Sequence, residues 1–220
     1  MDKATLFKRL AAQEPAVLLD LLSKAYDQLE HDQRRRVFGQ VANALPPEQV
    51  DGASLLAEIK QFQKDSLAGV YYAPFNINSK NFTHVPEETE DWFEKLSDFL
   101  KASTQLTGQG DHVHTVACFK ILYVLIDTME QGEEIVFADE LGSWMIQGDE
   151  KEYLAAYLTS LAAIATPEEF AAAAAPLIKR DSLYSFADQV YPTALSVAND
   201  AQKEHLEAEL QRQKIRTSRK

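Results

Sequence analysis

Residues 110–127 read GDHVHTVACFKILYVLID, and this stretch indicates a helical protein. Gly110 and Asp111 stand where a helix stop and a following N-cap are expected, directly before a long apolar pattern. The apolar side chains recur every three or four residues and so share one face of a helix: Val116, Phe119, Ile121, Leu122, Leu125 and Ile126. We therefore predict a helix that is capped by Asp111 and ends near Met129.

The stretch before it, PEETEDWFEKLSDFLKAST at residues 86–104, predicts a second helix. Acidic residues crowd its first turns, where negative charge complements the helix dipole. Trp92, Phe93, Leu96, Phe99 and Leu100 give it a broad apolar face. Gly108 and Gly110 end it, so the two helices are joined by a very short turn.

Similar patterns predict helices along the rest of the chain. In the N-terminal part we expect helices at 4–29, with a break at Pro15, at 32–44, and from Asp51 or Ser54 to Gly69. In the C-terminal part we expect helices at 150–165, 182–198 and 199–214. Between the first two of these, a further helix opens at a Thr166–Glu169 capping box and has Pro176 near its last turn. The only competing strand is FNIN at residues 75–78. We predict an all-α fold of antiparallel helical hairpins, stacked into a bundle or a short superhelix.

Composition places the chain among ordinary globular proteins. Its 220 residues are 45% hydrophobic and 25% charged, and they include only 8 glycines and 8 prolines. A single cysteine excludes an intrachain disulfide and a cysteine-based zinc site. We find neither a signal-peptide pattern nor an uncharged apolar run of about 18 residues. We expect a bacterial cytoplasmic protein with no cofactor and no membrane partner.

Charge is distributed unevenly and indicates a division into parts. Residues 1–66 carry ten acids and nine bases, residues 67–200 carry 21 acids and seven bases, and the last twenty carry three acids and six bases. We predict a small helical module at 1–66, a connecting segment at 67–86, an acidic helical domain at 87–214 and a basic flexible tail at 215–220. An acidic body repels phosphate, which argues against nucleic acid as a partner.

The two helices predicted within residues 92–130 carry small and aromatic residues at fixed offsets from the turn that joins them. The turn and the second helix contribute Gly110, Asp111, His112, Thr115 and Phe119, and the first helix contributes Phe99 and Ser103. In these positions the chain resembles a tetratricopeptide repeat, although His112 replaces a Tyr, Thr115 replaces an Ala, and Leu122 stands where a second Ala is expected. No period of about 34 residues recurs elsewhere. The resemblance implies stacked antiparallel hairpins and a protein-binding or scaffold role.

The first candidate site is the acidic segment from Asp127 to Glu152, which holds nine acids and one base. Inside it, acids alternate with large apolar side chains, in the order Glu133, Glu134, Phe137, Asp139, Glu140 and Trp144. Aromatic anchors within a charged rim are the usual composition of a binding hot spot. We therefore expect a protein partner with a basic surface here, while a solvated acidic face is the plainer alternative.

The second candidate is GVYYAPFNINSKNFTHVPEE at residues 69–88, which has four aromatics, three asparagines and two prolines but no helical period. Its rings, above all Tyr71, Tyr72 and Phe75, need burial because so apolar a loop would not be stable in water. Two interpretations stay open. The segment is either a brace between the N-terminal helices and the acidic domain, or it lines a ligand or peptide pocket.

An enzyme or metal-binding protein is the alternative function. It would use carboxylates of the 133–140 loop together with His112 or His84. His112 and His114 are two residues apart and point about 200° away from one another on a helix, so they could share an ion only if the first turn is not helical. Cys118 lies in the middle of a predicted helix, away from any helix N-terminus, and we expect it to be an inert core residue.

Overall fold

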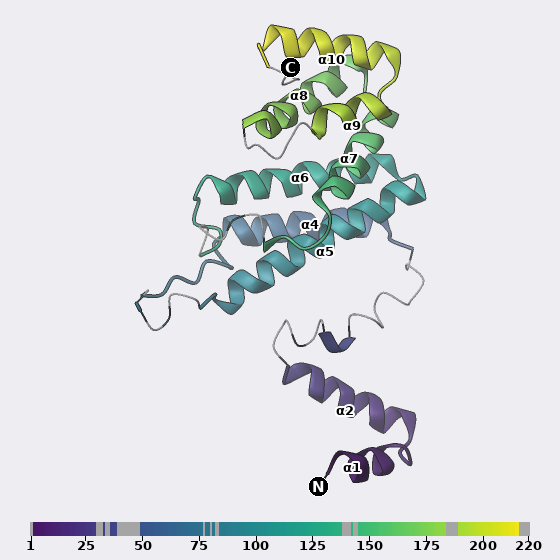
Figure 1. Ribbon diagram of the computed structural model, residues 1–220, viewed down its shortest axis with the longest axis vertical. Coiled ribbons are helices and arrows are strands. Elements are labelled where there is room, and N and C mark those ends of the chain that lie inside the picture. The colour runs from purple at the N-terminus through teal and green to yellow at the C-terminus, as the bar shows by residue number, and fades with distance from the viewer. Residues whose placement is uncertain are drawn as a thin grey trace. The chain divides into compact units, whose positions relative to one another are not determined.

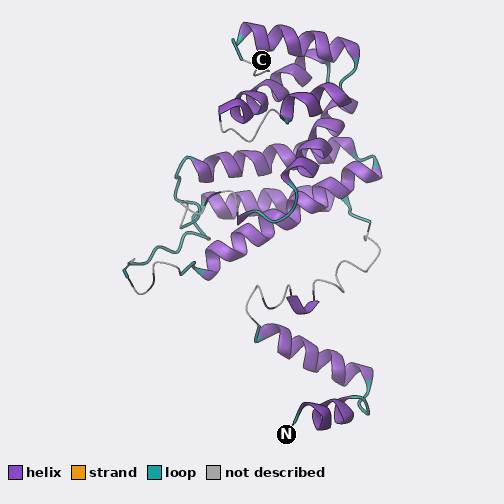
Figure 2. Cartoon of the chain, viewed as in Figure 1, coloured by secondary structure: helices purple, strands orange, loops and turns teal. Residues whose placement is uncertain are grey.

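A computed structural model gives the fold and confirms the all-α class. It describes residues 2–29, 33, 36–38, 49–76, 78–79, 81, 84–137, 142, 145–183 and 189–215. Within these residues every regular element is a helix, and no strand occurs (Figure 2). The described part of FNIN, namely Phe75, Asn76 and Asn78, is accordingly loop.

The chain divides into two compact units, Met1–Glu48 and Gln49–Lys220 (Figure 1). The first unit contains α1 and α2, which span Lys3–Leu10 and Pro15–Asp27. Pro15 is the first residue of α2, so the predicted break lies where expected. The helices of the second unit are α4 (Gly52–Leu67), α5 (Glu87–Gln109), α6 (His112–Glu130), α7 (Glu150–Ile164), α8 (Pro167–Leu183), α9 (Val190–Val197) and α10 (Asp200–Arg212).

α6 occupies the centre of the second unit. It packs against α4, α5 and α7, while α8 packs against α10 and α9 packs against α7 and α8 (Figure 1). The core that these contacts enclose is built around Trp92, Phe119, Leu122, Leu158 and Phe170, all of which are fully buried. By length and composition α6 could cross a membrane. Core helices of soluble proteins share that property, and α6 buries one whole face among its neighbours.

α4 belongs to the second unit, although the charge distribution placed residues 1–66 in one module. Leu55, Ile59 and Phe62 of α4 are buried in the same core as Trp92. The indole Nε1 of Trp92 donates a 2.9 Å hydrogen bond to Ser66 Oγ, and that hydroxyl donates in turn to the carbonyl of Phe62. A charge count cannot detect this packing, because all of these side chains are uncharged.

Several helix ends follow the predicted capping chemistry. Asp111 caps α6, and α6 ends one residue beyond Met129. Gly110 ends α5 with φ at 81°, a conformation that favours glycine. Thr166 and Glu169 exchange the two hydrogen bonds of a capping box at the start of α8.

Some helix boundaries differ from those predicted. Pro176 does not mark the end of its helix, because α8 continues to Leu183. The predicted helix 182–198 is wrong at its start, since α9 begins only at Val190 and residues 184–188 lie outside the described parts. Pro192 lies in the first turn of α9, where its missing N–H costs no helical hydrogen bond. Most of the predicted helix 32–44 also lies outside the described residues.

Candidate functional site

The loops that follow α4 and α6 meet at one place on the second unit. The ring of Phe137 lies edge-to-face against Phe75 at a centroid distance of 5.2 Å and against Tyr72 at 6.1 Å. Phe75 also contacts the ring of His84 at 5.2 Å. We call Tyr72, Phe75, His84 and Phe137 the aromatic cluster. It joins residues from the two candidate sites that the sequence presented separately.

The loop after α4 is held by Tyr71. This side chain is only 7% exposed, and its ring packs against Phe62 of α4 at 5.5 Å. Its hydroxyl accepts a 3.2 Å hydrogen bond from the Nζ of Lys95 on α5. Tyr71 therefore connects α4 to α5. For this residue the structure agrees with the interpretation of the segment as a brace. Tyr71 stays covered by the helices and presents no binding surface.

The asparagines of the same loop bind their own backbone. The N–H of Asn78 donates to the side chain of Asn81 at 2.7 Å, and the Asn81 side chain donates to the carbonyl of Asn76 at 2.9 Å. Short side chains of this kind commonly stabilise turns in this way. These three residues therefore shape the loop that carries Phe75.

The loop after α6 is fixed by two apolar side chains and one backbone contact. Ile135 and Val136 are buried, with 3% and 2% exposure, whereas Glu133 and Glu134 are exposed. The hydroxyl of Thr89 in the first turn of α5 donates a 2.9 Å hydrogen bond to the carbonyl of Phe137. The loop therefore presents its carboxylates to water while its position is set by the core and by α5.

The aromatic cluster lies at the surface. Tyr72, Phe75 and Phe137 are half-buried, and His84 is exposed. Exposed carboxylates belong to the segments that form it, since Glu133 and Glu134 precede Phe137, and Glu87 and Glu88 follow His84. The segments that form the cluster thus carry both aromatic rings and several exposed negative charges, a combination that attracts cationic side chains.

The structure accounts for only part of the predicted acidic site. Asp139, Glu140 and Trp144 lie outside the described residues. Met145, next to them in sequence, is half-buried against the core. The described part of the candidate site is therefore Glu133, Glu134 and Phe137, together with the ring residues of the other loop.

The histidines of α6 point to separate partners. The Nδ1 of His112 lies 3.1 Å from the hydroxyl of Ser160 on α7, and the Nδ1 of His114 lies 2.8 Å from a carboxylate oxygen of Asp111. His112 starts α6 and Glu133 follows its end, so the 19 residues of the helix hold them about 28 Å apart. His112 therefore cannot share a site with Glu133 or Glu134, while Asp139 and Glu140 lie outside the described residues. In the described parts of the chain, no three His, Cys, Asp or Glu side chains are placed to hold a metal ion.

Cys118 is a core residue, as expected. Its side chain is fully buried, and burial raises the pKa of the thiol to about 11. A thiol of this kind is almost entirely protonated near neutral pH and is a poor nucleophile.

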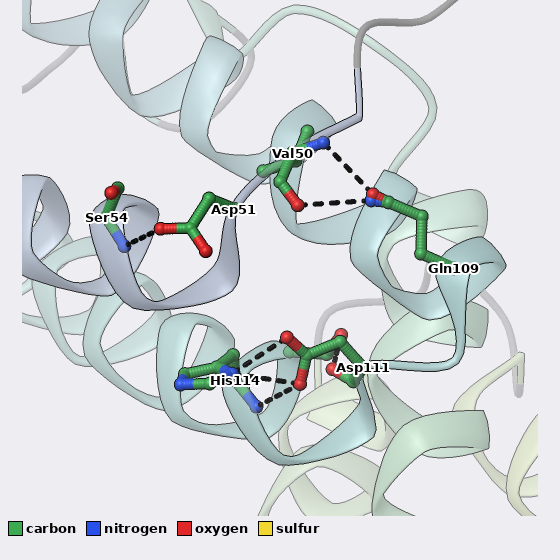
Figure 3. A network of polar contacts seen from close by, with 7 residues as sticks. Val50, Asp51, Ser54, Gln109, Asp111 and His114 are labelled. Carbon is green, nitrogen blue, oxygen red and sulfur yellow. Dashed lines mark hydrogen bonds and ion pairs between the residues drawn. The ribbon is translucent and has the colours of Figure 1, made fainter.

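A polar junction joins the start of α4 to the end of α5 and the start of α6 (Figure 3). The side chain of Gln109 accepts from the N–H of Val50 at 3.0 Å and donates to its carbonyl at 3.2 Å. Asp51 caps α4 by accepting from the N–H of Ser54 at 2.9 Å. Hydrogen bonds from the hydroxyl and the N–H of Ser54 lower the pKa of Asp51, and the charge of His114 adds a smaller effect.

The sequence indicates which residues of this junction cap helices, but it does not indicate the contact between Gln109 and Val50. Asp51 and Asp111 precede apolar patterns and could be recognised as N-caps. Gln109 has no such signal, because its partner Val50 is 59 residues away. The two hydrogen bonds between Gln109 and Val50 connect the start of α4 to the end of α5, while Asp51 and Asp111 bond within the first turns of their own helices. We assign the junction a structural role.

Comparison with known proteins provides no family for the chain, which matches no protein-family model, no curated protein and no solved structure. The assignment of a function therefore rests on the geometry and charge of the aromatic cluster and the acidic loop.

Proposed function

We propose that this is a non-enzymatic interaction or scaffold protein that binds a basic segment of another protein at the aromatic cluster. One observation carries the proposal. Phe137, from the acidic loop, contacts both Tyr72 and Phe75, from the aromatic segment. Two stretches with the composition of a binding surface, about 60 residues apart in sequence, thus form one surface.

The chemistry of this surface selects the kind of partner. A lysine or arginine side chain gains about 0.5–2 kcal/mol over an aromatic face, depending on how far it is desolvated. Exposed carboxylates at Glu133 and Glu134 add attraction at longer range. The net charge of −12 repels acidic partners and speeds encounter with basic ones. An extended basic peptide with an apolar residue would fit the combination of rings and carboxylates.

The proposal extends to the arrangement of the acidic domain and to its setting. We propose that the helices of residues 87–214 stack as antiparallel hairpins, in the manner of tetratricopeptide repeats. The short turn at Gly110 and Asp111 and the packing of α5 on α6 support this arrangement. We also propose a bacterial cytoplasm as the setting; its reducing conditions agree with a chain that has one cysteine, whose thiol is buried.

A peptide-display selection tests the binding surface even though the natural partner is not identified. A random peptide library would be selected on the wild-type chain, and the enriched peptides would then be measured by fluorescence polarisation. The test variant is Glu133→Lys with Glu134→Lys. The matched control is Glu58→Lys with Glu204→Lys, which makes the same change in net charge at exposed positions of α4 and α10.

We expect the selected peptides to be rich in lysine or arginine. Their dissociation constants should rise at least about tenfold with the test variant, change less than about threefold with the control, and fall as salt is lowered. Peptides that lack basic residues, or that bind both variants equally, would refute the proposal. A Phe137→Ala variant that binds the peptides as tightly as wild type would also contradict it.

A further inference from the structure

The helices of the N-terminal unit carry apolar side chains that they do not bury. No residue of α1 is buried. The exposed fractions are 58% for Phe7, 67% for Leu19 and 49% for Leu22. These side chains lie on two consecutive helices, α1 and α2, which three residues and an N-cap connect (Figure 1).

Helices this short need a partner to be stable. α1 has 8 residues and α2 has 13, and isolated helices below about 12–15 residues are marginal in water. In proteins most helical stability comes from packing of the apolar face. The described residues of the first unit leave Leu19 and Phe7 largely exposed, so these two side chains supply little of that contribution. A further surface packed on α1 and α2 would supply it.

The charges on the two helices indicate what kind of surface would match them. Residues 2–13 carry three bases and one acid, a net charge of +2. Residues 14–29 carry three acids and one base, a net charge of −2. The α1 segment is thus positive, the α2 segment is negative, and the pair as a whole is neutral.

A second copy of the chain would match this arrangement of one positive and one negative helix, because it carries the same two helices. In a two-fold symmetric pair, α1 of one copy lies along α2 of the other, and the same contact occurs twice. Each positive helix then faces a negative one. The rest of the chain carries the whole net charge of −12, so it would attract α1 but repel α2 and does not match both helices at once. An unrelated partner would need a matching separation of charge on two helices.

We propose that two copies of this protein associate through α1 and α2, with the apolar side chains of Phe7, Leu19 and Leu22 in the interface. Lys8 and Arg9 are exposed on α1, and Glu14 and Asp20 are exposed at α2. Asp20 pairs with Lys24 on its own helix at 2.7 Å, but both side chains are largely exposed. Such a surface pair is weak and leaves its charge available to a neighbour. The proposal is independent of the basic partner proposed above.

Sedimentation velocity of the full-length chain measures the association. We expect the wild type to be dimeric at tens of micromolar. Leu22→Lys should raise the dissociation constant of the dimer at least about 30-fold, because it places a charge in an apolar contact. Val124→Lys is the matched control. It makes the same kind of change at a position of α6 that is 54% exposed, and it should leave the dimer unchanged.

A charge exchange tests the pairing of α1 with α2 directly. Lys8→Glu with Arg9→Glu turns the α1 segment from +2 to −2, and Glu14→Lys with Asp20→Lys turns the α2 segment from −2 to +2. Each double variant alone should weaken the dimer about tenfold or more. The quadruple variant should recover most of the association, because the charges again match between copies. Far-UV circular dichroism on each variant separates loss of helix from loss of association.

Three results would overturn the proposal. One is a wild-type chain that stays monomeric up to about 100 µM, which would mean that α1 and α2 pack within a single chain or are covered by another protein. Another is a dimer that Leu22→Lys leaves intact, since the copies would then associate elsewhere. The third is a quadruple variant no more associated than the double variants although its helix content is unchanged.

Discussion

Gly52 permits a close approach between two helices in the described core. A Cβ at this position would overlap a carboxylate oxygen of Asp111 and would lie 2.8 Å from the Cβ of His114. Gly52→Ala would therefore force the starts of α4 and α6 apart and disturb the polar junction of Figure 3. We expect a loss of about 1–3 kcal/mol in the free energy of unfolding, measured by urea denaturation.

Gly108→Ala is the control for that substitution. Gly108 lies near the end of α5 and is exposed, and a Cβ added there would meet no atom within 4 Å beyond its own stretch of helix. Alanine should there stabilise the chain by up to about 1 kcal/mol, because it restricts the unfolded state and favours helix. If both substitutions changed stability by the same amount, the close contact at Gly52 would not be the cause.

Cys118 gives a prediction about alkaline pH. Burial raises the pKa of its thiol from 9.0 to about 11, so the folded protein holds this proton more tightly than the unfolded chain. The protonated thiol therefore stabilises the folded state fully below about pH 9, and this contribution to the unfolding free energy is lost as pH rises towards 11. The difference in unfolding free energy between wild type and Cys118→Ala should therefore narrow between about pH 8 and about pH 10.5.

Thiol labelling provides a second measurement on the same residue. An aromatic disulfide reagent should not modify the native protein at about pH 8, because the thiol is both buried and protonated. Labelling should become fast once urea unfolds the chain. Rapid labelling of the native state, or a stability difference that widens with pH, would contradict the buried and protonated state of Cys118.

Gln202 joins the start of α10 to the end of α7. Its side-chain amide donates to the carbonyls of Ala162 and Ala165 at 3.0 and 3.1 Å, and its carbonyl accepts from the N–H of Asn199 at 3.0 Å. The side chain is 1% exposed, so its partners cannot turn to water instead. Gln202→Ala should cost about 3 kcal/mol, whereas Gln211→Ala at an exposed position should cost about 0.5 kcal/mol or less.

Thermal unfolding followed by circular dichroism would compare the two glutamine variants. If Gln202→Ala had the same melting temperature as Gln211→Ala, the hydrogen bonds between α7 and α10 would contribute little to the stability of the fold. Glutamine at this position also completes a capping box with Asn199. Part of the expected cost therefore belongs to the helix terminus alone.

Helix positions were predictable from local chemistry wherever a cap and an apolar face coincided. Asp111 and the Thr166–Glu169 pair mark helix starts because they act on backbone groups within three residues. Pro176 shows the limit of this reasoning. Proline disfavours a helix interior by removing one hydrogen bond, but a long helix with a strongly helix-forming alanine run on its N-terminal side can continue past it.

The candidate site could be predicted only in pieces. Composition alone singled out Phe137 with its neighbouring glutamates, and Tyr72 with Phe75. Their contact depends on where the ends of α4 and α6 lie in the fold, and neither loop has a period that encodes its partner. Burial of Tyr71 was expected together with that of Tyr72 and Phe75, but nothing in the sequence distinguished Tyr71 as the fully buried ring or indicated Lys95 as its partner.

The boundary between the two units gives the last prediction. All buried hydrophobic side chains in the described parts of the chain lie at Leu55 or beyond. A fragment of residues 49–220 should therefore keep a cooperative thermal transition within a few degrees of the full-length chain. A fragment of residues 67–220 follows the boundary indicated by charge and lacks α4. It loses Leu55, Ile59 and Phe62, each worth about 1.5–3 kcal/mol of burial, and the Ser66 acceptor of Trp92.

That loss is comparable to the whole stability of a typical domain, which is about 5–15 kcal/mol. The shorter fragment should therefore lack a near-ultraviolet circular dichroism signal from Trp92 and should melt without cooperativity. Cooperative melting of 67–220 near the wild-type temperature would show that the core closes without α4, and the unit boundary at residue 48 would then be incorrect. If α1 and α2 hold two copies together, the 49–220 fragment should also sediment as a monomer while retaining its binding of basic peptides.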